Sequence, residues 1–112
     1  MYERLAELIQ KLEHDDSDVR GQAALALGKI AAAAAVPALI KTLSSDRDPF
    51  VRYSLASALG ETGPAAAAAV PTLAAALEEG DVGMRIAAAI ALGQIGDPAA
   101  IPYLTVASDD EI

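Results

Sequence analysis

The chain of 112 residues contains no cysteine and no tryptophan, and it has only one phenylalanine and one histidine. Without cysteine there is no disulfide bond, no thiolate metal site and no cysteine nucleophile. A single histidine cannot build a histidine-rich metal centre. Hydrophobic residues nevertheless make up 54% of the chain, and much of that is alanine. We therefore expect thin, alanine-rich helices that pack closely together.

Positive charge and long apolar runs are also scarce. The chain has 8 Lys and Arg against 16 Asp and Glu, a net charge of −8, which argues against a nucleic acid partner because phosphates select basic surfaces. No apolar run reaches about 18 residues, so no membrane span or membrane partner is expected. The charged amino-terminal residues do not resemble a signal peptide. These absences favour a cytoplasmic protein of one domain.

What the chain does contain is a repeat. The tripeptide Ala-Leu-Gly begins at Ala26, Ala58 and Ala91, at spacings of 32 and 33 residues. Each copy is preceded by an arginine that follows an apolar residue, and by an aspartate four residues before that arginine. A branched apolar residue followed by proline recurs in step with them. A period between about 20 and 50 residues is typical of stacked arrays, which work mainly as surfaces that hold other molecules.

Each unit is predicted to be a pair of helices. The first helices open with a proline, which fits a position where its missing N–H would be unpaired anyway: Pro37, Pro71 and Pro102. Residues 1–13 supply the same element without a proline. The second helices follow an acidic turn and are expected over 17–30, 49–61 and 82–95. An aspartate stands at the N-cap of each of them: Asp16, Asp48 and Asp81.

One face of each second helix is predicted to be buried. Apolar residues recur one residue before the repeating arginine and seven and ten residues after it, with Thr62 as the exception at the last position. The glycine of Ala-Leu-Gly lies next to this face. It costs the helix about 1 kcal/mol relative to alanine, and we expect it to permit the close approach of a neighbouring helix.

The repeating pattern is similar to that of a known family. Residues 16–30 read Asp-x-x-Val-Arg-x-x-Ala-Ala-x-Ala-Leu-Gly-x-Ile, and residues 95–104 read Ile-Gly-Asp-Pro-Ala-Ala-Ile-Pro-Tyr-Leu. Together they resemble the HEAT-like repeat of the phycobilisome-lyase type. The resemblance covers almost the whole chain and implies an all-α, right-handed α-solenoid of about three and a half helix-pair repeats. Its units are residues 1–35, 36–69 and 70–100, followed by a half-unit of residues 101–112.

The joints between units differ from one another. The third joint contains Gly96, Asp97 and Pro98, which stop a helix, and the second joint keeps Gly63 and Pro64. The first joint is an alanine run over residues 31–35 with no stop signal. There the sequence allows either a helix that runs on or a poorly specified turn. We expect the alanines of residues 31–35 and 65–69 to fill tight contacts between repeats.

The repeating arginines have a structural and a functional interpretation. Each arginine lies one helical turn after its capping aspartate, so Asp–Arg bridges are predicted to run within and between repeats as a structural ladder. The ladder residues are Asp16, Arg20, Asp48, Arg52, Asp81 and Arg85. In the alternative interpretation, the three arginines form a basic track for an anionic ligand. Most other acidic residues lie at the turns, where a solvated edge is expected.

No catalytic pattern occurs in the sequence. It contains no Ser-His-Asp set, no glycine-rich phosphate loop and no cluster of metal ligands, so we expect no enzyme activity and no cofactor. Positions one, five and nine residues after each arginine point away from the predicted core. In HEAT-like stacks the second helices line the concave surface. The candidates for a protein-binding surface there are Leu25, Tyr53, Ser57, Ile86 and Ile90.

The predicted function is a non-catalytic scaffold whose concave surface binds a partner protein or peptide, with Tyr53 and the two isoleucines as anchors. Two alternatives remain open. One is an accessory subunit of a lyase or of a chromophore-handling enzyme, which the resemblance implies. The other is a fragment of a longer or designed array. In the half-unit, Tyr103, Leu104 and Val106 are expected to be partly exposed and to pair with another copy of the chain or with downstream sequence.

Overall fold

The computed structural model describes residues 2–79 and 81–102, and these residues form helices and turns with no strand. The α-helices are α1 (Tyr2–Lys11), α2 (Ser17–Lys29), α3 (Val36–Ser45), α4 (Pro49–Thr62), α5 (Val70–Glu79) and α6 (Val82–Ile95). Short 3₁₀ segments follow each even-numbered helix, at Ala33–Ala35, Gly63–Ala69 and Pro98–Ala100. The prediction of an all-α solenoid is confirmed.

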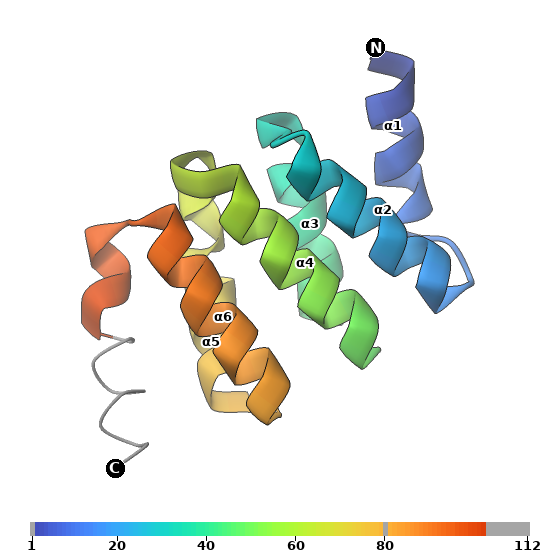
Figure 1. Cartoon of the computed structure of the whole chain (residues 1–112). Helices are drawn as coiled ribbons and strands as arrows, with labels where there is room; N and C mark the ends of the chain where they lie inside the picture. The colour runs from blue at the N-terminus through green and yellow to red at the C-terminus, as the bar shows by residue number, and fades with distance from the viewer. Residues whose placement is uncertain (1, 80, 103–112) are drawn as a thin grey trace.

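The helices form two layers (Figure 1). Helices α2, α4 and α6 lie side by side in one layer, and α3 and α5 lie behind them. Each odd-numbered helix packs against the even-numbered helix that follows it. The even-numbered helices contact one another far more extensively than α3 contacts α5. The tightest packing of the solenoid is therefore within the layer of α2, α4 and α6.

The even-numbered helices begin where the sequence predicts, because each has its aspartate cap. The Oδ1 atom of Asp16 accepts a hydrogen bond from the backbone N–H of Asp18 at 2.8 Å. Asp48 and Asp81 each cap a helix in the same way, accepting from the residue three positions on, at 3.1 and 2.8 Å. A side-chain oxygen thereby pairs a backbone donor that the first turn leaves free. The predicted bounds of these helices agree with the structure to within one residue.

Helices α3 and α5 begin one residue earlier than predicted. Helix α3 starts at Val36 and α5 at Val70, so each proline is the second helical residue. Ile101 and Pro102 are also helical, and they are the last described residues. The expectation about Tyr103, Leu104 and Val106 therefore lies outside the described part of the chain.

The core lies between the two layers. The leucines of the three Ala-Leu-Gly tripeptides are at most 1% exposed, and the leucines of α3 and α5 are buried opposite them. Thr62 is half-buried, and its hydroxyl donates to the carbonyl of Ala58 at 2.8 Å, which satisfies its polar group. Ile95 is buried, but Ile30 at the same position of the first unit is 50% exposed. The prediction that Ile30 is buried is therefore wrong.

The glycines of Ala-Leu-Gly sit where even-numbered helices meet. A Cβ atom on Gly28 would lie 2.7 Å from the Cα atom of Ala58, and one on Gly60 would lie 3.0 Å from the Cα atom of Ala91. Both distances are to backbone atoms, so only glycine permits this spacing of the helices. The expectation of close helix approach is confirmed between α2 and α4 and between α4 and α6.

The first joint stops its helix without a glycine. Helix α2 ends at Lys29, so the alanine run does not continue it. Ala31 adopts a φ of +47°, and Gly63 and Gly96 adopt +75° and +73°. All three residues lie fifteen positions after their capping aspartate. A positive φ thus recurs at the same position of each unit, but in the first unit an alanine takes a backbone conformation that favours glycine.

Ala31→Gly is therefore expected to stabilise the chain. The left-handed conformation costs an alanine about 1–2 kcal/mol, and the greater chain entropy of glycine in the unfolded state offsets about half of that gain. We expect a net gain of about 0.5–1 kcal/mol in the free energy of unfolding, measured by urea denaturation. The control is Ala34→Gly, at an exposed position with negative φ, which should lower stability. A loss of stability in Ala31→Gly would contradict the prediction.

Candidate functional site

The repeating arginines do not pair with their capping aspartates. Arg20 instead reaches across to the second unit, where its Nε atom lies 2.7 Å from Oδ2 of Asp46 and its Nη2 atom lies 3.4 Å from Oδ1. The Nη1 atom of Arg20 also donates to the carbonyls of His14 and Asp15, at 2.9 and 3.0 Å. The guanidinium therefore ties the turn before α2 to the turn before α4.

The Arg20–Asp46 pair is mostly shielded, with side-chain exposures of 19% and 9%. The hydrogen bond that Arg20 donates to Asp46 raises the pKa of Arg20 above its ordinary value, and the negative charges of Asp46, Asp48 and Asp16 add to this effect. Arg20 is therefore held as a cation by several carboxylates. This bidentate pair is one bridge between repeats, as the ladder requires, but its carboxylate is not a repeating one.

The other two arginines form no such bridge in the described part of the chain. The Nη1 atom of Arg52 donates to the backbone carbonyls of Leu43 and Asp46, at 2.9 and 3.1 Å. The described pairs Asp48–Arg52 and Asp81–Arg85 form no ion pair, and Arg85 is exposed. The predicted continuous ladder is wrong for these residues. The guanidinium of Arg52 is instead held by the backbone carbonyls before α4, and that of Arg20 by the non-repeating Asp46.

The five predicted surface residues lie on one layer but differ in exposure. Tyr53, Ile86 and Ile90 are 53%, 52% and 57% exposed. Leu25 and Ser57 are half-buried. They occupy the same position of α2 and α4 that Ile90 occupies in α6, and each has a following even-numbered helix beside it. Only the last of these equivalent positions is left open among the described residues.

Sequence reasoning missed Phe50 and Val82. Both are exposed, at 37% and 61%, and both lie in the first turn of an even-numbered helix, α4 or α6. The signal for Phe50 was present, because a residue two positions before the repeating arginine points to the same side as the other surface positions. With Tyr53, Ile86 and Ile90, these residues give the layer five large exposed apolar side chains.

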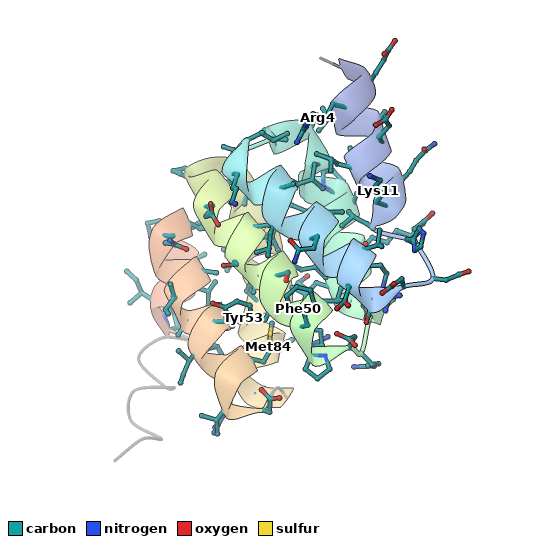
Figure 2. The ribbon with its side chains drawn as sticks, turned by 45° about the vertical axis from the view of Figure 1, so that its right-hand side comes forward. Arg4, Lys11, Phe50, Tyr53 and Met84 are labelled. Atoms are coloured by element: carbon teal, nitrogen blue, oxygen red, sulfur yellow. The ribbon has the colours of Figure 1, made fainter. Side chains whose placement is uncertain are left out.

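The α2–α4 and α4–α6 interfaces, called the first and second joints from here on, place a glycine and a large side chain on opposite helices. At the first joint a Cβ atom on Gly21 of α2 would overlap the ring of Phe50, so the aromatic side chain lies over the glycine. At the second joint the same two positions hold Tyr53 and Gly83. The large residue is now on the earlier helix and the glycine on the later one. Figure 2 shows Phe50 on the α2 side of α4, and Tyr53 and Met84 between α4 and α6.

A groove opens at the second joint. Its volume is about 370 Å³, and Tyr53, Gly83 and Met84 line it together with charged side chains. Those charged side chains are Arg47, Arg52 and Asp81. We refer to this space as the Tyr53 groove. It is similar in volume to the smaller ligand pockets of proteins.

The comparison with known families agrees with this geometry. The family model for HEAT repeats matches residues 5–70 and, in a second match, residues 65–112. The chain belongs to the HEAT-repeat family. No curated protein matches the chain at a significant level. Members of the HEAT-repeat family generally act as scaffolds for protein interactions. The resemblance to HEAT-like repeats is thus confirmed, and the phycobilisome-lyase type stays a prediction.

The described surface of this HEAT-repeat protein has features that suit contact with another molecule. Among residues 2–79 and 81–102, no group of three or more His, Asp and Glu side chains is placed to hold a metal ion. No helix within those residues is long and apolar enough to cross a bilayer. The described surface offers exposed apolar side chains, two nearby guanidinium groups and an open groove. These features suit the binding of another polypeptide.

Proposed function

We propose that this HEAT-repeat protein is a non-catalytic scaffold that binds a partner protein or peptide on the layer of α2, α4 and α6. The observation that carries the proposal is the gathering of large exposed apolar side chains on this one layer, at Phe50, Tyr53, Val82, Ile86 and Ile90. Scattered exposed apolar residues need no explanation, but a group of them on one face marks an interaction site.

Two further observations support this surface. The helices of this layer contact one another more closely than α3 contacts α5, and a two-layer stack curves toward its more tightly spaced layer. This difference supports the assignment of this surface as the concave one, which solenoids use for binding. Tyrosine is also enriched among the residues that dominate binding energy at interfaces. The net charge of −8 favours a protein partner over a nucleic acid.

The test is capture of partners from a lysate by the immobilised chain and by the double variant Tyr53→Ala, Ile86→Ser. We expect the double variant to lose specific capture while its helix content, measured by circular dichroism, stays the same. Both side chains are more than half exposed, so their removal costs little stability. The matched control is Ile30→Ser, at a half-exposed isoleucine at the end of α2, which should capture normally.

Capture that survives the double variant would place binding elsewhere on the molecule and overturn the proposal. Loss of capture in Ile30→Ser as well would point to a general loss of folding or solubility. Recovery of a coloured ligand bound to the chain would instead favour the accessory subunit of a chromophore-handling enzyme.

A further inference from the structure

The Tyr53 groove exists because a side chain is missing at one position of the repeat. Phe50 covers Gly21 at the joint of α2 and α4. The residue equivalent to Phe50 in α6 is Gly83, where a Cβ atom would meet only Oδ1 of Asp81, at 3.5 Å. The side chain that would fill this joint is therefore absent, and Tyr53 is left more than half exposed beside the space.

The wall of the groove is apolar on one side. Tyr53 contributes an exposed ring, and the buried side chain of Met84 reaches its surface. A methionine wall adapts to the shape of an apolar group and makes favourable contacts with an aromatic one. The space over Gly83 therefore suits one large apolar side chain, in the place that an aromatic residue occupies at the first joint.

The other side of the groove is positively charged, although the chain as a whole is acidic. Arg47 is exposed, and within the described part of the chain its guanidinium has no hydrogen-bond partner. Arg52 uses Nη1 to hold two backbone carbonyls, and this fixes its position at the groove. The one acidic wall residue, Asp81, already accepts a hydrogen bond from the N–H of Met84. The lining thus carries two cations against one carboxylate, and this excess of positive charge suits one anionic group.

We propose that the Tyr53 groove binds a peptide segment that presents a large apolar side chain next to a single carboxylate. The apolar side chain lies over Gly83 against Tyr53 and Met84, and the carboxylate pairs with Arg47 and Arg52. The net charge of −8 disfavours a run of acidic residues, so one carboxylate fits better than several. This inference rests on the proposed function and names the chemistry of the partner.

The probe is N-acetyl-phenylalanine, which carries a carboxylate next to a large apolar side chain, and the control probe is its uncharged amide. We expect the acid to shift the backbone amide resonances of Arg52, Tyr53 and Met84 in the ¹⁵N-labelled full chain, with saturation. The amide should bind about three- to fivefold more weakly, the factor that an exposed ion pair supplies. Added salt should weaken the acid and leave the amide unaffected.

Two variants locate the binding in the groove. A Cβ atom at Gly83 would meet nothing closer than Oδ1 of Asp81 at 3.5 Å, so Gly83→Leu should keep the fold, fill the space and abolish binding of both probes. Arg47→Gln should bring the affinity of the acid closer to that of the amide, because only Arg52 is then left to pair with the carboxylate. Equal binding of the two probes, or shifts that persist in Gly83→Leu, would overturn the proposal.

The probe titrations and the capture experiment together distinguish failure of the groove proposal from failure of the scaffold proposal. If neither probe binds while partner capture still depends on Tyr53 and Ile86, the groove assignment fails and the scaffold stands. If the acid binds as expected while capture is insensitive to Tyr53→Ala with Ile86→Ser, the groove stands and the wider surface fails.

Discussion

Gly28→Ala is expected to destabilise the chain by about 1–3 kcal/mol, whereas Gly93→Ala is expected to stabilise it by up to about 1 kcal/mol. The two glycines are the third residues of equivalent Ala-Leu-Gly tripeptides. A Cβ atom on Gly28 would lie 2.7 Å from Cα and 3.0 Å from Cβ of Ala58, so α2 and α4 would have to separate. Within the described residues nothing lies within 4 Å of a Cβ atom on Gly93.

Urea denaturation of both variants measures this difference. Each substitution removes a helical glycine and adds one methyl group, so the intrinsic gain in helix propensity is the same. The difference between the two variants is then the free-energy cost of placing a methyl group between α2 and α4. Stability changes of the same sign and size would show that the close approach at Gly28 does not constrain the helices.

Leu59→Ala is expected to lower the free energy of unfolding by about 2–5 kcal/mol. Leu59 is fully buried in α4, which packs against α2 on one side and α6 on the other. In a stack each unit is stabilised by its neighbours, so a cavity in the central unit weakens two interfaces at once. Because domains are stable by only about 5–15 kcal/mol, this loss is a large part of the total.

Leu8→Ala is the matched comparison, because Leu8 is 9% exposed and belongs to α1, which packs mainly against α2. Its effect should be smaller and local. Hydrogen exchange measured along the chain should show faster exchange throughout in Leu59→Ala, and chiefly in α1 in Leu8→Ala. An equal loss of stability in both variants would show that the effect of a cavity does not depend on how many neighbouring helices its unit contacts.

The sequence predicts most of the fold because the relevant interactions are local. An aspartate N-cap acts within three residues of its own helix, so Asp16, Asp48 and Asp81 locate the starts of α2, α4 and α6. The 3.6-residue period of apolar positions gives the buried face for the same reason. The exposed Ile30 is the exception, because burial of a residue at a helix end depends on which neighbour covers it.

Contacts between units are harder to predict because they depend on how one unit is rotated relative to the next. The partner of Arg20 is Asp46, which is not part of the repeating pattern and is brought close only by stacking. The exposure of the candidate surface has the same origin, since Ser57 and Ile90 are equivalent in sequence but only Ser57 is flanked by a following even-numbered helix in the described chain. The Tyr53 groove depends on residues from two units, and no single unit reveals it.

The opposite fits of the two joints make the three units non-interchangeable. If the central unit were deleted, α2 would be followed by α6, and Gly21 would face Gly83 with no side chain between them. If the central unit were duplicated, Tyr53 of one copy and Phe50 of the next would compete for the same space. Unequal recombination within this gene, the usual route by which repeat arrays grow and shrink, would therefore yield an unfilled joint in the shorter product and an overfilled one in the longer.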